Sequence, residues 1–178
     1  MKQQSLSALP RPVLIGLMGC GKSSIGRRLS QELKLPLVDL DDAIVEKAGM
    51  GIPDIFAKLG EEAFRDMESA VLADHIEDRA ILATGGGVVL RKANRGLLKA
   101  HPPVIWLKAA PEFLARRIAG DSNRPLITNQ DTLEKLTTLA VERYPLYEAC
   151  ADLVIDRDEA KKGEIVSLII QYLEKVQA

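Results

Sequence analysis

Cysteine, histidine and aromatic residues are scarce in this chain of 178 residues. It holds two cysteines, two histidines, one tryptophan, three tyrosines and three phenylalanines. Two cysteines, Cys20 and Cys150, are too few for a disulfide framework or a zinc quartet, so we expect a reducing, cytoplasmic location. Few aromatics also leave little to stack on the bases of a nucleic acid.

An excess of charge and a long apolar run are missing too. The 24 basic residues nearly balance the 25 acidic ones, which disfavours a nucleic-acid coat or a polybasic membrane anchor. No apolar run approaches the ~20 residues needed to cross a bilayer, and the opening MKQQSLSALPRP lacks the apolar segment of a secretory signal. We therefore predict neither a nucleic-acid nor a membrane partner.

The order of apolar segments predicts an α/β fold. Short apolar runs at 13–17, 35–40, 80–84, 103–107 and 152–156 are typical of buried strands. The stretches 21–33, 61–79, 132–149 and 163–176 carry apolar residues at helical spacing. This alternation favours a parallel sheet between helices, with ligands gathered where the strands end. The length fits one domain over 1–178, and we expect residues 1–11 to be flexible.

The stretch GLMGCGKSS at 16–24 has the full G-x-x-x-x-G-K-[ST] pattern, between a predicted strand and a predicted helix. Its glycines let the backbone aim N–H groups at phosphate oxygens, and the helix start adds positive potential. Lys22 is expected to reach the β- and γ-phosphates, and the Ser23 hydroxyl to bind magnesium. A glycine-rich turn with an incidental lysine is the weaker alternative.

A pair of carboxylates follows the second run, in LVDLDD at 37–42. In an extended chain Asp39 and Asp41 point to the same side, so one could serve magnesium and the other a substrate hydroxyl. The alternative is helix capping, which we expect mainly of Asp42.

Two further segments are candidates for ligand contact. In EEAFRDMES, Arg65 and Glu68 share a helix face, where an isolated surface ion pair is the simpler interpretation. In TGGGVVL, the glycines at 85–87 directly follow a strand and would weaken a sheet, which favours close approach of backbone to a ligand.

Arginines gather in the second half of the chain. Arg116, Arg117 and Arg124 surround the polar loop GDSN, which is typical of a lid that closes over phosphates. Arg143 in ERYPLY lies near the end of a predicted helix, where a solvated role is equally compatible with the sequence.

Together, GLMGCGKSSIG, LVDLDD, GEEAFRDMES, TGGGVVL, NRPLI and ERYPLY resemble the shikimate kinase family, in that order and spacing, over about residues 12–160. The resemblance implies a P-loop kinase fold with three layers, a five-stranded parallel sheet in the order 2-3-1-4-5, and a mobile lid at about 116–128. It implies transfer of the γ-phosphoryl of ATP to the 3-hydroxyl of shikimate in aromatic amino-acid biosynthesis, by a monomer that needs Mg²⁺.

The resemblance also assigns residues by position. Shikimate is assigned to Asp41, Arg65, Gly86 and Arg143; ATP to Gly19, Cys20, Gly21, Lys22, Ser23, Ser24, Arg117 and Arg124; magnesium to Ser23 and Asp39; and catalysis to Lys22, Asp41 and Arg124. Arg117 would lie over the adenine, and Arg124 is the lid arginine. Ser24 and Cys20 stand where the family more often has Thr and Ser or Ala, and both keep the positions small. No adenine contact is assigned within 156–163.

Three alternatives remain open from the sequence. A related small-molecule kinase acting on gluconate would share the phosphate loop. A nucleotide-dependent switch would bind partners instead, although the chain has no N-K-x-D motif. Cys20 could be a redox-sensitive thiol, but a small residue filling the loop is favoured.

Overall fold

Five short parallel strands form the centre of the computed structural model, which describes residues 5–119, 129–158 and 160–178. Their order is β2-β3-β1-β4-β5, as the sequence predicts. The strands are β1 (Val13–Ile15), β2 (Leu37–Asp39), β3 (Ile81–Ala83), β4 (Val104–Lys108) and β5 (Leu153–Asp156). Each lies within, or one residue beyond, one of the predicted apolar runs. Val13 of β1 pairs with Leu82 of β3 on one side and with Val104 of β4 on the other.

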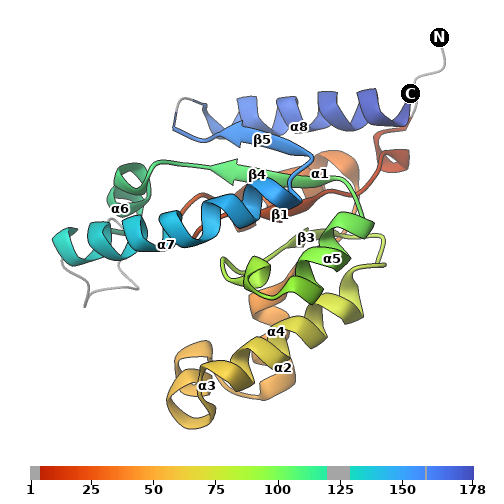
Figure 1. Cartoon of the computed structure of the whole chain (residues 1–178). Helices are drawn as coiled ribbons and strands as arrows, with labels where there is room; N and C mark the ends of the chain where they lie inside the picture. Colours follow the sequence, from red (N-terminus) through yellow and green to blue (C-terminus); the bar gives the residue numbers. More distant parts are fainter. Residues whose placement is uncertain (1–4, 120–128, 159) are drawn as a thin grey trace.

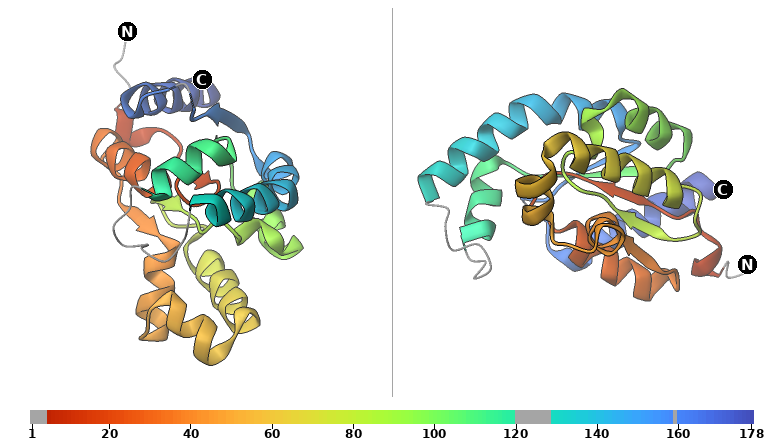
Figure 2. Two further views of the ribbon diagram at one scale, coloured as in Figure 1. Left: turned by 90° about the vertical axis from the view of Figure 1, so that its left-hand side faces the viewer. Right: turned by 90° about the horizontal axis from the view of Figure 1, so that it is seen from below.

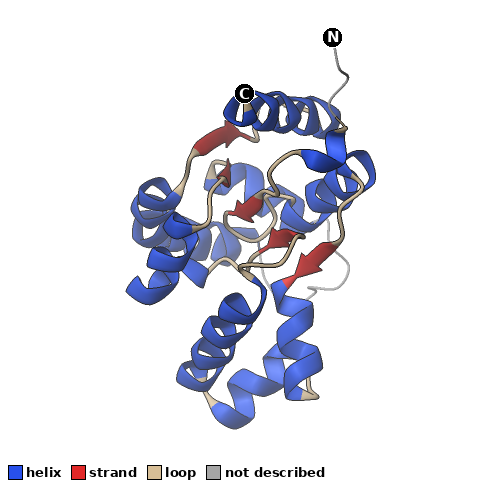
Figure 3. Ribbon diagram, turned by 90° about the vertical axis from the view of Figure 1, so that its right-hand side faces the viewer, coloured by secondary structure: helices blue, strands red, loops and turns tan. Residues whose placement is uncertain are grey.

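Helices cover both faces of the sheet, and Figure 3 shows the strands enclosed among them. The α-helices are α1 (Lys22–Leu33), α2 (Leu40–Ala48), α3 (Ile52–Leu59), α4 (Glu61–His75), α5 (Lys92–Ala100), α6 (Pro111–Ala119), α7 (Asn129–Cys150) and α8 (Lys162–Gln177). Helices α1 and α8 pack together on one side, whereas α4, α5 and α7 lie on the other (Figure 1). Because both faces are covered, β1 and β3 are buried along their whole length and are apolar throughout.

Helices α2, α3 and α4 form an arm beyond the edge of the sheet, at the bottom of Figure 1 and of the left view of Figure 2. Helix α4 contacts both α2 and α3, and buried Ile44, Ile55 and Phe64 come one from each of these helices. Phe56 and Phe64 add a ring contact with centroids 4.7 Å apart. The arm therefore has apolar packing of its own and ends beside the strand termini.

Some boundaries differ from those predicted. Helix α4 ends at His75 with Ile76 as its C-cap, whereas apolar spacing extended the prediction to residue 79. Helices α3, α5 and α6, which span eight or nine residues each, were not predicted from the sequence. Within residues 5–11, a 3₁₀ turn spans Leu6–Ala8. Leu9 is buried, and Arg79 donates a hydrogen bond to the Leu9 carbonyl.

Among the described residues no helix is long and apolar enough to cross a membrane.

Candidate active site

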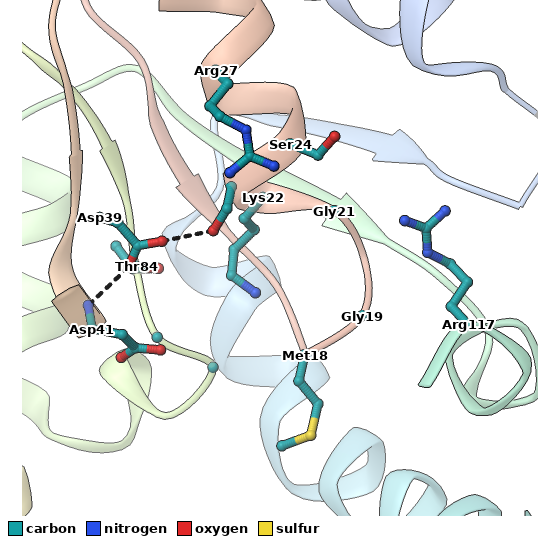
Figure 4. A pocket seen from close by; sticks show the side chains of 13 residues that line it. Met18, Gly19, Gly21, Lys22, Ser24, Arg27, Asp39, Asp41, Thr84 and Arg117 are labelled. Atoms are coloured by element: carbon teal, nitrogen blue, oxygen red, sulfur yellow. Dashed lines mark hydrogen bonds between the residues drawn. The ribbon is translucent and has the colours of Figure 1, made fainter. Parts of the chain in front are cut away.

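The loop between β1 and α1 borders a pocket of about 300 Å³ at the carboxyl ends of the strands (Figure 4). Gly16, Gly19 and Gly21 have φ angles of 147°, 84° and 97°, which L-residues with side chains rarely adopt. At Gly16 a Cβ would also lie 2.8 Å from the Leu107 carbonyl. The glycines of the motif are thus required by the path of the backbone, which curls around the space that a phosphate would fill.

Lys22 is the first residue of α1 and folds back over this loop. Its Nζ donates to the carbonyls of Gly16 at 2.5 Å and Leu17 at 3.0 Å. The ammonium group therefore lies at the mouth of the pocket, at the positive end of the α1 dipole. Both features favour an anion at this point.

Asp39 links the phosphate loop to the arm. Its Oδ2 accepts from the Ser23 hydroxyl at 2.7 Å and its Oδ1 from the amide N–H of Asp41 at 3.0 Å (Figure 4). Oδ1 also accepts from the amide N–H of Asp42 at 3.4 Å. Asp39 is therefore the N-cap of α2, and the prediction that Asp42 caps the helix is wrong. The helix begins at Leu40, two residues earlier than the apolar pattern indicated, so Asp42 already lies inside it.

Asp41 lies in the first turn of α2 and not in an extended strand. The pleat argument that placed its carboxylate beside that of Asp39 is therefore wrong, although both residues line the same pocket. Burial, followed by the charge of Asp39, raises the pKa of the Asp41 carboxyl, and Lys22 and Arg65 oppose that shift. The Asp41 carboxylate thus has a stronger affinity for a proton than an exposed carboxylate.

A second pocket of about 370 Å³ adjoins the first and shares Met18, Asp41, Gly85 and Gly86 with it. Its remaining walls come from the arm, from the glycine loop and from α7. The lining residues are Ile52, Phe56, Glu61, Phe64, Arg65, Glu68, Gly87 and Arg143. Asp41 therefore stands at the junction of the pocket beside the phosphate loop and the pocket lined by Arg65 and Arg143.

Both arginines of the second pocket have unused donors. The Nε atoms of Arg65 and Arg143 are buried and have no hydrogen-bond partner among the described residues. Buried polar groups in folded proteins are usually paired, so these two N–H groups are exceptions. Both arginines line the same cavity, and two cationic groups in one cavity favour an anionic ligand. A planar carboxylate suits such forks because it can accept two hydrogen bonds from one guanidinium.

Glu68 holds the first of these arginines in place. Its Oε1 accepts from Arg65 Nη1 at 2.9 Å, and the two side chains are only 2% and 12% exposed. The interpretation as an isolated surface ion pair is therefore wrong: the pair is buried at the wall of the second pocket. Burial raises the pKa of the Glu68 carboxyl, and its hydrogen bond with Arg65 opposes the shift.

Comparison with known proteins agrees with this geometry. The family model described as shikimate kinase matches residues 18–174. A curated shikimate kinase from Enterococcus faecalis is 44% identical over 165 residues, covering 92% of this chain and 98% of the relative. The chain belongs to the shikimate kinase family.

Solved shikimate kinases have the same fold. The shikimate kinase from Acinetobacter baumannii in complex with shikimate superposes with a TM-score of 0.88 at 35% identity, covering 97% of both chains. The shikimate kinase from Aquifex aeolicus superposes with a TM-score of 0.78 at 31% identity, covering 94% of this chain and 98% of that one. The P-loop kinase fold expected from the sequence is thereby confirmed.

The structure brings most of the predicted ATP-site residues of this chain together. The first pocket is lined by Gly19, Gly21, Lys22, Ser23, Ser24 and Arg117, beside Asp39, Asp41 and Gly86. Arg124 lies outside the described residues. Cys20 does not line the pocket: it is fully buried, 3.6 Å from the Lys22 ammonium group, as the prediction of a small residue filling the loop requires.

Arg157 is a residue of the site that sequence reasoning missed. It follows β5 and is 7% exposed; its Nε donates to the Cys20 carbonyl at 3.2 Å and its Nη1 to the Ala160 carbonyl at 2.7 Å. The guanidinium groups of Arg157 and Arg117 lie 5.6 Å and 5.8 Å from the centre of the Phe113 ring. Arg157 thus ties the phosphate loop to the end of the sheet. Its position directly after a strand was the available signal.

Proposed function

We propose that this protein transfers the γ-phosphoryl group of ATP to the 3-hydroxyl of shikimate. The observation that carries the proposal is the pocket lined by the two arginines Arg65 and Arg143, which adjoins the phosphate pocket at Asp41. A small carboxylate with several hydroxyls matches these donors, and shikimate is such a molecule.

The phosphate loop and Lys22 bind the triphosphate in this proposal. Backbone N–H groups from Gly19 to Ser24 contact the phosphate oxygens, and the Lys22 ammonium group exchanges its carbonyl partners for the β- and γ-phosphates. Arg117 covers the adenine and Arg124 closes over the phosphates, as the family resemblance implies.

Ser23 and Asp39 are the residues that would hold Mg²⁺. Their oxygen atoms lie 2.7 Å apart at the edge of the phosphate pocket, and Mg²⁺ prefers oxygen ligands from one or two side chains together with phosphates and water. No group of three or more His, Cys, Asp or Glu in the described segments could form an all-protein metal site, which also fits a shared site of that kind. When bound, the ion would neutralise charge on the β- and γ-phosphates.

The acceptor is oriented by its carboxylate. Arg65 and Arg143 bind the carboxylate, the backbone at Gly86 contacts the ring hydroxyls, and Asp41 accepts a hydrogen bond from the 3-hydroxyl. The oxygen of that hydroxyl forms a bond to the γ-phosphorus as the bond to the β-bridging oxygen breaks, and Asp41 takes the proton late in this step. The products are shikimate 3-phosphate and ADP. We expect the enzyme to act as a cytoplasmic monomer.

The test is a steady-state assay of ADP release with shikimate, quinate and gluconate as acceptors. All three carry a carboxylate, so the comparison isolates recognition of the ring and its hydroxyls. We expect kcat/KM for shikimate to exceed that for gluconate by at least about 100-fold, which is about 2.7 kcal/mol of transition-state binding. Comparable values for the two acids would refute the proposal, as would ATP consumption that requires a protein partner.

A further inference from the structure

The glycine loop at 85–87 is hydrogen-bonded to α7 through a buried hydroxyl. Tyr147 is fully buried, and its hydroxyl donates to the Gly86 carbonyl. Gly86 lines both pockets, whereas Tyr147 lines neither. The hydroxyl therefore contacts a residue of the pocket wall, Gly86, without lining either pocket itself.

Tyr147 and Arg143 lie four residues apart on α7, so they share one face of the helix. A side chain at Gly86 would lie 3.3 Å from Arg143 Nη1 and 3.6 Å from the Tyr147 hydroxyl. Both side chains thus meet the backbone of the glycine loop at the same residue. The loop, the arginine and the tyrosine form one contact group.

The bond also fixes how the next peptide unit presents its donor. The peptide between Gly86 and Gly87 is trans, so the Gly87 N–H points opposite to the Gly86 carbonyl and away from Tyr147. Within residues 5–119, 129–158 and 160–178, neither the Gly86 nor the Gly87 amide donates a hydrogen bond. Gly86 and Gly87 both line the second pocket, so these two unpaired donors belong to its wall.

The ring of Tyr147 has little freedom to move. Its centroid lies 5.5 Å from that of Trp106 and 6.1 Å from that of Tyr144, and Trp106 belongs to β4, which lies beside the central strand β1. Burial raises the pKa of the Tyr147 hydroxyl far above its ordinary value, so the group remains a donor at any pH at which the enzyme works. The hydroxyl therefore has a fixed position and remains a hydrogen-bond donor to the glycine loop.

We propose that Tyr147 is a positioning residue for the acceptor: its bond to Gly86 holds the glycine loop at the distance from Arg143 at which both can contact one shikimate molecule. This inference rests on the proposed function, because it takes the second pocket to be the shikimate site. It assigns Tyr147 no contact with either substrate. The nucleotide site, which has its own supports in Lys22 and Arg157, should not depend on this bond.

The test compares Tyr147→Phe, which keeps the ring and removes the hydroxyl, with Tyr144→Phe. Tyr144 is a matched control because it belongs to the same helix and aromatic cluster, but its hydroxyl donates to the Ala109 carbonyl instead. We expect Tyr147→Phe to raise KM for shikimate about tenfold, equivalent to about 1.4 kcal/mol, and to leave KM for ATP within twofold. Tyr144→Phe should leave both within twofold.

A purely structural role would move the melting temperature without separating the two KM values. A shikimate KM within twofold of wild type, or an equal rise in both KM values, would overturn the inference. The ¹³C resonance of the Gly86 carbonyl provides a readout without turnover: it should shift in Tyr147→Phe and not in Tyr144→Phe, and an unshifted resonance also overturns the inference. If the wild-type protein fails to use shikimate, the proposed function is refuted, while the resonance still reports on the bond.

Discussion

Replacing Asp41 by Asn removes one charge at the junction of the two pockets and keeps the shape of the side chain. The amide oxygen of Asn can still accept a hydrogen bond from the acceptor hydroxyl, so orientation is retained and only proton acceptance is lost. A positioned base contributes roughly 10²–10⁴-fold to a rate. Because the transition state of phosphoryl transfer is loose and the proton leaves late, we expect a loss in kcat at the lower end, about 100-fold.

The same substitution should change the pH dependence of activity. Burial and the neighbouring Asp39 raise the pKa of Asp41 above its ordinary value of 3.8, and the base must be ionised to act. In the wild type, kcat/KM for shikimate should therefore fall as the pH drops through this raised pKa. That fall should be absent from the residual activity of Asp41→Asn.

Asp41→Asn should lower the activity but raise the stability of the folded protein. A carboxyl whose pKa is raised on folding binds its proton more tightly in the native state, so stability decreases as the pH rises from the unfolded pKa through the folded one. Above this window the ionised Asp41 destabilises the fold. Asp41→Asn should therefore melt at a higher temperature than wild type at pH 7, and the difference should shrink as the pH falls toward the unfolded pKa.

Two neighbouring aspartates serve as controls. Asp42→Asn removes an exposed charge from the same helical turn and should leave kcat within twofold. Asp39→Asn keeps a good N-cap but weakens a magnesium ligand, so it should raise the magnesium concentration needed for half-maximal rate. The test measures kcat of all three variants as a function of magnesium concentration and of pH. The reasoning is refuted if Asp41→Asn retains more than a fifth of wild-type kcat, or if its magnesium curve shifts as that of Asp39→Asn does.

Four further outcomes are expected. Arg143→Ala should weaken shikimate binding by about 1.5–3 kcal/mol, the worth of a charge-assisted hydrogen bond, without affecting ATP in calorimetry; equal losses for both ligands would contradict this. Cys20→Ser should keep activity within tenfold, and a larger loss would indicate sulfur chemistry. Arg157→Gln should raise KM for ATP about tenfold by freeing the Cys20 carbonyl, whereas a rise confined to shikimate would exclude that role. The Cβ introduced by Gly87→Ala would collide with the Arg65 guanidinium. In the steady-state assay of ADP release, this variant should therefore raise KM for shikimate and leave KM for ATP unchanged.

The sheet could be predicted from the sequence because burial on both faces leaves continuous apolar runs, and all five runs contain a strand. The start of α2 could not. The segment LVDLDD has three aspartates that can each cap a helix, and the one that does so is Asp39, which also accepts a hydrogen bond from Ser23, sixteen residues away. Local patterns contain no information about such a partner.

The site was predictable where a motif fixes the backbone, as at the phosphate loop. It was not predictable where a side chain acts through tertiary contact. Glu68 looked like half of a surface pair because its spacing from Arg65 is the same whether or not other elements cover the helix. Arg157 lies in a polar segment, and its burial arises only when α6 and the phosphate loop pack against the end of β5.

The division of labour between the two pockets has a consequence for engineering. Apart from four shared residues, the phosphate pocket is built by the phosphate loop, α1, the ends of β2 and β3, and α6, whereas the apolar wall of the acceptor pocket comes from α3 and α4. Acceptor selectivity can therefore be redesigned by replacing residues 52–64 of the arm, while the residues that line the phosphate pocket are left unchanged. Such a graft must leave Asp41, the proposed proton acceptor, and Asp39 in place, since the two carboxylate oxygens of Asp39 connect Ser23 to the start of α2.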